Sequence, residues 1–355
     1  MKLSVDLKDL KDTVGHAAHV LSNRPVVPVL GGIVLSLADG VLQASSFDYE
    51  TAATATLDIL AGDEGRLLVP GRALFDMLGR LPAGIVDIVA EGATVTLTAG
   101  RAVATLPLMA IAEYPELPAL PKQIGVVDGE ALARAFKHCA ESMPTDNEKL
   151  IGVNVIGEAG SLHLASTDSF RLHTFELAWS GDDVVMTVPP SALKSVQAVT
   201  GPVRLHADES TLAIVSDTRT TITRLVAKEY VRWRTLVATP THLMLASTDD
   251  LAEALQRAAL VCEKGDRVNF SLDGTTLTLD AGHGDSTRTV EDLEVDYSGP
   301  VLQTAFNPRF LHGALAPVES GRVQLGFTKP TAAVLVSDPA ASDYLGLVMP
   351  MRVSK

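Results

Sequence analysis

Three segments of the chain carry the same pattern of apolar positions, at the spacing i, i+4, i+7, i+8 and i+11. The three sets are Leu10, Val14, Ala17, Ala18 and Leu21; Leu132, Phe136, Cys139, Ala140 and Met143; and Leu251, Leu255, Ala258, Ala259 and Cys262. This spacing places each set on one face of an α-helix. The sets begin 122 and 119 residues apart, close to a third of the 355-residue chain, which predicts an internal triplication.

A second helix is predicted in each third. The segments VPGRALFDML (69–78), VPPSALKSVQ (188–197) and FNPRFLHGAL (306–315) align through Leu74, Leu193 and Leu311. In each segment a strand residue is followed by Pro or Asn and then by the helix. Proline is tolerated there because the first N–H groups of a helix have no partner within the helix.

Alternating apolar and polar residues predict strands between these helices. Hairpins are expected over 35–48, 154–168 and 270–282, with Asp39-Gly40 and Asp273-Gly274 as turns in which both residues take positive φ. Further strands are expected over 93–106, 210–226, 329–338 and 344–353. The pattern predicts an α+β fold of three similar domains, 1–119, 124–237 and 242–355, each with two helices packed on antiparallel sheets. Connectors rich in proline separate them, at Pro115, Pro118, Pro121 and Pro240.

The composition is that of a globular protein, with 46% apolar and 20% charged residues. The net charge of −14 on its own argues against a nucleic-acid-binding surface, which is normally basic. No run of about 18 apolar residues predicts a membrane span. The charged start lacks the apolar segment of a signal peptide, so we expect a cytoplasmic protein. Cys139 and Cys262 fall in the apolar sets and are expected to be core residues.

Motifs of enzymes and metal proteins are missing from the sequence, including phosphate-binding loops, nucleophile elbows and Cys-x-x-Cys pairs. We therefore expect no catalytic residues, no cofactor and no metal site. Asp168 and His173 are predicted on one strand, pointing to opposite faces, which rules out an acid–base pair. His16, His138 and Arg257 share one repeat position off the apolar face. They predict either a solvated helix face or a positive surface turned toward a polyanion.

Several short words of the sequence carry a family resemblance. They are NRPVVPVLGGIVL (23–35), SFDYE (46–50), TDSFRL (167–172), AFNPRFL (305–311) and VMPMR (348–352). Over its whole length the chain resembles the β subunit of bacterial DNA polymerase III, the sliding clamp. SFDYE and EYPELPALP (113–121) resemble actinobacterial members in particular. The resemblance implies a head-to-tail homodimeric ring that encircles duplex DNA, regardless of base sequence, and tethers the replicative polymerase for processive DNA replication.

A simple size argument agrees with a dimer. Helices pack about 8–10 Å apart, so the six inner helices of one chain would enclose a hole too narrow for a DNA duplex, whereas twelve would not. A ring also reconciles the acidic composition with DNA binding. Because a ring holds DNA by topology, weak phosphate contacts are enough, and weak contacts permit sliding.

The resemblance implies a pocket between the second and third domains that docks short peptides of replication partners. Those partners are the α subunit of DNA polymerase III, the clamp loader and other proteins with a clamp-binding motif, and cyclic-peptide inhibitors would use the same pocket. The pocket residues carried over are Leu150, Thr167, Phe170, Arg171, Leu172, Val231, Thr235, Leu236, Leu347, Met349, Pro350, Met351 and Arg352. The expected DNA contacts are Arg24, Arg72, Lys149, Arg134 and Lys137. At the dimer joint, Leu106 is expected to face Leu260 and Val261.

The chain departs from the family pattern near this pocket. Val231 and Ala238 stand where the family usually has proline, and Phe170 and residues 147–149 also differ. Replacing proline frees φ and changes the pocket wall. Two alternatives to the ordinary clamp therefore stay open. One is a second clamp copy whose altered pocket gives self-resistance to a clamp-binding antibiotic, and the other is a triplicated scaffold that binds no DNA.

Overall fold

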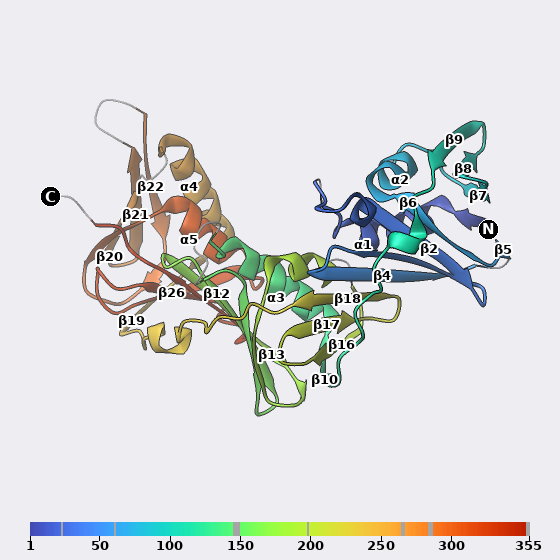
Figure 1. Cartoon of the computed structure of the whole chain (residues 1–355). Coiled ribbons are helices and arrows are strands. Elements are labelled where there is room, and N and C mark those ends of the chain that lie inside the picture. The colour runs from blue at the N-terminus through green and yellow to red at the C-terminus, as the bar shows by residue number, and fades with distance from the viewer. Residues whose placement is uncertain are drawn as a thin grey trace. The chain divides into compact units, whose positions relative to one another are not determined.

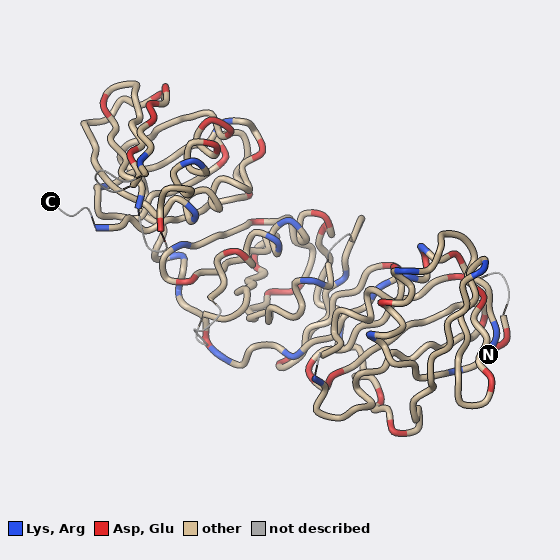
Figure 2. The backbone as a smooth tube through the Cα atoms, turned by 90° about the horizontal axis from the view of Figure 1, so that it is seen from above, with Lys and Arg blue, Asp and Glu red and all other residues tan. Residues whose placement is uncertain are grey.

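The computed structural model describes residues 1–22, 24–59, 62–144, 150–196, 199–263, 267–282 and 287–352. The chain divides into two compact units (Figure 1). Unit 1 comprises Met1–Ala133 and Val188–Val226, and unit 2 comprises Arg134–Thr187 and Ala227–Lys355. Lys and Arg positions are interspersed with Asp and Glu along the backbone (Figure 2), so the net negative charge leaves room for local basic surfaces.

The helices of the described residues lie close to the predicted positions. The α-helices are α1 (Leu7–Ala18), α2 (Gly71–Leu78), α3 (Gly129–Glu141), α4 (Thr248–Val261) and α5 (Pro308–Leu315). The 3-10 helices are η1 (Pro28–Gly31), η2 (Ile111–Glu113), η3 (Pro190–Val196) and η4 (Trp233–Leu236). Side-chain caps fix four of the α-helix starts, because Asp6, Asp128, Ser247 and Asn307 each accept a hydrogen bond from a backbone N–H of the first turn. None of the helices in the described part of the chain is long and apolar enough to span a membrane.

Unit 1 contains antiparallel strands in two sheets. The strands are β1 (Lys2–Asp6), β2 (Gly32–Ala38), β3 (Val41–Phe47), β4 (Thr51–Asp58), β5 (Gly62–Asp63), β6 (Gly65–Pro70), β7 (Ile85–Glu91), β8 (Thr94–Ala99), β9 (Ala102–Pro107), β10 (Gln123–Asp128), β16 (Pro202–Ala207), β17 (Thr211–Val215) and β18 (Arg219–Arg224). One sheet has the order β5-β1-β7-β8-β9, and the other runs β10-β16-β17-β18-β4-β3-β2-β6. The pairing of β4 with β18 makes the second sheet continuous between the first and second repeats.

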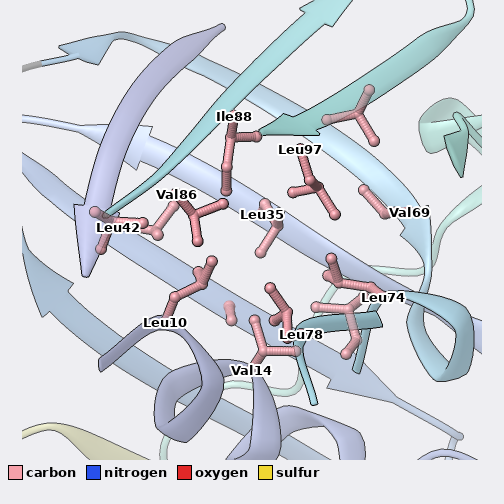
Figure 3. Close-up of a cluster of buried hydrophobic side chains, with 14 of the residues drawn as sticks. Leu10, Val14, Leu35, Leu42, Val69, Leu74, Leu78, Val86, Ile88 and Leu97 are labelled. Carbon is pink, nitrogen blue, oxygen red and sulfur yellow. The ribbon is translucent and has the colours of Figure 1, made fainter. Parts of the chain in front are cut away.

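The main core of unit 1 lies between these sheets and the helices α1 and α2 (Figure 3). Leu10 and Val14 come from α1, and Leu74 comes from α2. They pack against apolar side chains of both sheets, among them Leu35 and Ile88. The four residues of the first apolar set that lie on α1 are all buried, so the predicted helix face is confirmed for them. Leu21 is also buried, but it lies beyond the end of the helix.

Unit 2 is built in the same way. Its strands are β11 (Val153–Glu158), β12 (Ser161–Thr167), β13 (Arg171–Ala178), β14 (Ser180–Gly181), β15 (Val184–Val188), β19 (His242–Ser247), β20 (Val268–Asp273), β21 (Thr276–Gly282), β22 (Arg288–Glu294), β23 (Asp296–Tyr297), β24 (Leu302–Phe306), β25 (Arg322–Phe327), β26 (Val334–Ser337) and β27 (Tyr344–Val348). One sheet has the order β15-β11-β12-β13-β27-β26-β25-β19-β23, and a smaller one has the order β22-β21-β20-β24. The pairing of β13 with β27 repeats the pairing of β4 with β18.

The three predicted hairpins are confirmed as β2–β3, β11–β12 and β20–β21. Asp39 and Gly40 both have positive φ, at 51° and 75°, as predicted for this turn. The same prediction is wrong at Asp273, which pairs with Thr276 as the last residue of β20. Only Gly274 of that predicted pair has positive φ.

Two predictions about the second repeat are wrong. Its second helix is the 3-10 helix η3 rather than an α-helix. Two consecutive prolines at its start remove N–H donors, and the Ser195 hydroxyl donates back to the Ala192 carbonyl, which competes with α-helical bonding. Gln197, at the end of that predicted helix, lies outside the described residues. In α3, Ala140 is exposed and Ala135 is buried in its place. The domain boundaries stay a prediction.

Candidate functional site

An apolar cavity of about 530 Å³ lies in unit 2. Its walls come from the turn between β12 and β13, the start of β13, the segment around η4, and β27 with the residue that follows it. The lining residues are Leu150, Thr167, Ser169, Phe170, Arg171, Leu172, Val231, Leu236, Ala333, Leu347 and Met349. A cavity of this size is typical of a site for a small ligand or a few side chains of a peptide.

Nine of the thirteen residues predicted for the pocket line this cavity. The four that do not are Thr235, Pro350, Met351 and Arg352. β27 ends at Val348, so the strand predicted over 344–353 is shorter than expected. The segment after it bends away to make its own bonds, since the Met351 N–H donates to the Ala305 carbonyl at 2.7 Å.

The floor of the cavity is buried and held by packing and a hydrogen bond. Leu172 and Leu347 lie opposite each other on β13 and β27 and belong to a buried cluster with Tyr230 and Trp233. The Tyr230 hydroxyl accepts the Thr167 N–H at 3.1 Å, and burial raises the pKa of Tyr230 to about 12. This phenol therefore stays neutral. The cluster holds the floor in place before any ligand arrives.

The rim of the cavity is apolar and exposed. Phe170, Val231, Leu236 and Met349 each keep between 40% and 60% of their surface in water. Four exposed apolar side chains around one hollow are unusual on a soluble domain and mark an interaction site. The arrangement suits the apolar side chains of a partner.

The one guanidinium in the lining set, that of Arg171, is already engaged. Its Nε lies 3.0 Å from Asp168 Oδ2, and a second nitrogen donates to the Glu141 carbonyl. Its guanidinium carbon lies 4.6 Å from the centre of the Phe310 ring. Arg171 therefore shapes the wall rather than offering a free charge.

The predicted placement of Asp168 and His173 on one strand is wrong. Asp168 lies in the turn before β13, where its carboxylate accepts backbone N–H groups. His173 lies on β13, fully buried, with Nδ1 2.9 Å from the His138 carbonyl oxygen. Burial lowers the pKa of His173 to about 4, so the ring is neutral near pH 7.

His16, His138 and Arg257, which share one repeat position, form neither the solvated helix face nor the positive surface that the sequence predicted. His16 and His138 are buried, so neither is on a solvated face. Burial lowers the pKa of His16 to about 3, which excludes a positive charge there near pH 7. Arg257 is exposed, but it pairs with Glu253 at 3.2 Å and Glu291 at 2.7 Å.

The predicted DNA contacts separate into three groups. Arg24, Arg72 and Lys137 have exposed side chains. Arg134 is held by Asp343 at 2.5 Å, Glu319 at 2.9 Å and the Pro317 carbonyl at 2.6 Å, so its charge is used inside unit 2. Lys149 lies outside the described residues.

A basic cleft of about 540 Å³ in unit 1 was not predicted. Lys8 and Lys11 of α1 line it together with Lys194 of η3 and Arg219 of β18, and so do Asp9 and Asp12 of α1. Arg219 is paired with Asp12 at 2.5 Å, so the three lysines carry the positive charge of the cleft. The i, i+3 spacing of the two α1 lysines on the polar face was the only sequence signal for it. Lys194 and Arg219 lie far from these lysines in the sequence, and only the fold brings them to the cleft.

The residues predicted for the dimer joint differ in exposure. Leu260, near the end of α4, is 86% exposed, and Val261 is half-buried. Leu106 of β9 is buried in the core of unit 1. A leucine so exposed on a helix is typical of an interface that a single chain leaves uncovered.

Comparison with known proteins gives consistent matches. Residues 1–118 match the N-terminal domain, and residues 235–352 the C-terminal domain, of the DNA polymerase III beta subunit. The chain is 33% identical to the beta sliding clamp of Streptomyces coelicolor, over 100% of both proteins. It is 28% identical to the beta sliding clamp homolog GriR of Streptomyces muensis, over 99% of both.

Solved structures show the same fold. The DNA polymerase III beta subunit of Thermotoga maritima superposes with a TM-score of 0.91 at 25% identity, covering 99% of this chain and 100% of that one. The sliding clamp of Pseudomonas aeruginosa bound to griselimycin superposes with a TM-score of 0.92 at 21% identity, with the same coverage. The chain therefore belongs to the DNA polymerase III beta subunit family and is a DNA sliding clamp.

Proposed function

We propose that the cavity of unit 2 docks short apolar peptide segments of replication partners, among them the α subunit of DNA polymerase III and the clamp loader. The observation that carries this is a preformed buried floor surrounded by four exposed apolar side chains. The chain then acts as a processivity subunit with no catalytic site of its own.

Docking of one peptide should be weak. Each apolar anchor that is fully buried contributes about 1.5–3 kcal/mol, and ordering the peptide offsets part of this gain. Two anchors therefore give an affinity that permits exchange. Partners can replace one another on a single ring under these conditions.

The test is titration of a fluorescent peptide from the polymerase α subunit. Leu236→Asp places a charge on the rim of the cavity and should abolish binding. Val26→Asp is the matched control, because Val26 is almost fully exposed and lies outside the cavity. Equal binding to both variants would contradict a docking role for the cavity.

The repeats also support a head-to-tail homodimer. In the described chain, β4 pairs with β18 and β13 pairs with β27, so the strand after the first hairpin of one repeat joins the last strand of the next. The corresponding strands left over are β22 and β9, and each lies at the edge of its sheet. Exposed edges invite pairing. Because one chain makes too small a ring, a second copy supplies the missing partner strand.

The register of this third pairing follows from the first. Thr54 lies opposite Thr220 in the pairing of β4 with β18. The hairpin registers equate Thr54 with Val290 and Thr220 with Val103. The two valines therefore face each other across the dimer joint. They are 57% and 66% exposed in the single chain, as an uncovered pair would be.

A charge-exchange experiment tests this register. Val103→Glu or Val290→Lys alone should give monomers in analytical ultracentrifugation, because each buries an unpaired charge. The double variant should recover dimers, because the two charges lie opposite each other. Leu260→Asp should also give folded monomers. If all the variants with one substitution remained dimers, the proposed dimer interface would be wrong. If the double variant stayed monomeric, the proposed register would be wrong.

Duplex DNA passes through this ring in our proposal. The basic cleft of unit 1 supplies phosphate contacts, together with the exposed Arg24 and Lys137. Such contacts position the duplex and carry no sequence information. Rings loaded on closed circular DNA should persist at salt concentrations that release linear DNA. Loss of circular and linear DNA at the same salt concentration would contradict encirclement.

A second candidate, a clamp copy with an altered pocket, rests on Val231. This residue lines the cavity where the family pattern has proline. GriR of Streptomyces muensis is 28% identical to the chain, whereas the Streptomyces coelicolor clamp is 33% identical, which favours the ordinary clamp. Calorimetry with griselimycin separates the two. Tighter binding to Val231→Pro than to the natural chain supports the altered copy, and equal binding removes it. The family assignment does not support the other alternative, a triplicated scaffold that binds no DNA.

A further inference from the structure

Two histidines of α1 line the basic cleft of unit 1. The rings of His16 and His19 meet edge to face, with their centres 5.0 Å apart. His16 Nε2 lies 3.4 Å from the Thr220 carbonyl oxygen and 3.3 Å from the Thr221 hydroxyl oxygen, so β18 provides its partners. His19 Nε2 is shielded from water and has no hydrogen-bond partner in the described part of the chain. This nitrogen is free to take a proton when the charges around it change.

The charged groups of the cleft come from three elements. They are Lys8, Asp9, Lys11 and Asp12 of α1, Lys194 of η3 and Arg219 of β18. α2 adds only the uncharged ring of Phe75. Arg219 and Asp12 form an ion pair, whereas none of the three lysines has an ion pair within the residues that the structure describes. The cleft therefore carries a net positive charge that an anion would offset.

This surrounding charge acts on His19. Burial lowers the pKa of His19 below its ordinary value of 6.5, a hydrogen bond to the His16 backbone opposes this, and the charges of Lys194 and Arg219 lower the pKa further. The ring is therefore neutral near pH 7. An anion bound at Lys194 would cancel part of the positive field and favour the protonated ring.

The second repeat shows that the fold does not require a histidine at this position. The apolar sets equate His16 with His138 and His19 with Glu141. Glu141 Oε1 lies 3.5 Å from His138 Nδ1, so the second repeat supplies its own carboxylate beside the histidine. In the first repeat a histidine stands in place of that carboxylate, and three unpaired lysines line the same cleft. This cleft is therefore suited to an anion from outside the chain.

We propose that His19 couples the binding of phosphate in this cleft to the uptake of a proton. The inference rests on the phosphate contacts proposed above for duplex DNA. The phosphodiester offsets the charges of the lysines, and a proton from solution converts the neutral imidazole of His19 to imidazolium. The added positive charge then holds the phosphate more tightly. Duplex DNA therefore binds more tightly as the pH falls.

Titration of a short linear duplex at low salt, at pH values between about 6 and 8, tests this coupling. The charge of a phosphodiester is constant over this range, so a change in affinity comes from the protein. For one proton the affinity should rise as the pH falls, by at most about tenfold per pH unit. Calorimetry at neutral pH in buffers with different ionisation enthalpies should show net proton uptake by the natural chain.

Two variants assign the proton to a residue. His19→Gln keeps a hydrogen-bonding side chain that does not titrate, so it should bind the duplex with a flatter pH profile and without the proton uptake. His163→Gln is the matched control, because His163 is a half-buried histidine of β12 that does not line the cleft. It should leave both quantities unchanged. Urea denaturation checks that both variants are folded.

The outcomes separate this inference from the proposed DNA contacts. Duplex binding without proton uptake in the natural chain, or uptake that persists in folded His19→Gln, overturns the role of His19 and leaves the phosphate contacts standing. Failure of the natural chain to bind the duplex at low salt overturns both. If His19→Gln does not fold, NMR titration of His19 in the natural chain decides. A titration midpoint that the duplex does not move to higher pH overturns the coupling.

Discussion

Substitutions of Met349 and Leu172 distinguish the contribution of a side chain to peptide docking from its contribution to folding stability. Its side chain stands on the rim of the cavity with 45% of its surface exposed. Its N–H bonds the Phe170 carbonyl through the backbone, and alanine keeps this bond. Leu172 lines the same cavity but is only 2% exposed and belongs to the buried cluster. Truncating the two side chains should therefore have opposite consequences.

The exposed fraction sets the size of the effect. Full burial of a methionine side chain contributes about 1.5–3 kcal/mol. A docked peptide can cover only the 45% of Met349 that is still exposed, so Met349→Ala should weaken docking about 3- to 10-fold, or roughly 0.7–1.4 kcal/mol. Leu172→Ala removes buried contacts and should lower the free energy of unfolding by about 2–5 kcal/mol.

The assay is calorimetric titration of the polymerase α peptide, with urea denaturation of each variant in parallel. Arg352→Ala is the control, since this residue is exposed and does not line the cavity. It should leave both quantities unchanged. Unaltered affinity in Met349→Ala, together with normal affinity in a folded Leu172→Ala variant, would refute the assignment of the apolar wall as the source of binding energy.

Three further predictions concern charge. His16 and His173 have pKa values lowered by burial to about 3 and 4, against 6.5 unfolded, so each contributes stability that is full above about pH 6.5 and is lost as pH falls toward the folded value. Acidification from pH 7 to pH 5 should cost about 2 kcal/mol per histidine in urea denaturation, and His16→Gln should remove its share. Arg134→Met should destabilise the fold, measured by thermal denaturation, because Asp343 loses its partner. Lys8→Ala with Lys194→Ala should reduce the slope of log affinity against log salt by about 2 for linear duplex, without changing the melting temperature.

The sequence predicted the fold where a periodic pattern coincided with local signals. The faces of α1 and α4 and the Asp39-Gly40 turn followed from spacing and turn chemistry alone. η3 did not, because two prolines and Ser195 override the apolar pattern that it shares with α2 and α5. Buried histidines such as His16 were also missed. The hydrogen-bond partners of His16, Thr220 and Thr221, lie more than 200 residues away, and no local pattern reveals them.

The candidate site was predictable where its residues form contiguous words. Phe170 to Leu172 and Leu347 to Met349 stand in two short segments, so the family resemblance carried them over directly. Ala333 was missed because a small residue before a strand has no signal of its own. Met351 does not line the cavity, because after β27 the chain turns toward Ala305, which sequence adjacency does not show.

Neighbouring repeats are joined by two strand pairings, β4 with β18 and β13 with β27, which we call the two joints. The two joints share the same backbone arrangement, and the apolar cavity lies at the second. The Met349 N–H bonds the Phe170 carbonyl in the second repeat, and the Arg224 N–H bonds the Glu50 carbonyl in the first. The pair is apolar in one joint, whereas Glu50 and Arg224 lie 3.9 Å apart as an exposed ion pair in the other.

The residue pairs beneath the two joints also differ, and the pair at the cavity is the larger and more apolar one. Leu172 and Leu347 face each other at one joint, and Ala52 and Ile222 take their places at the other. A smaller alanine and a charged rim remove the apolar lining that a peptide anchor needs, while the strand pairing that closes the joint depends only on backbone groups. Triplication therefore fixes the architecture, and a few side chains at one joint decide where partners bind.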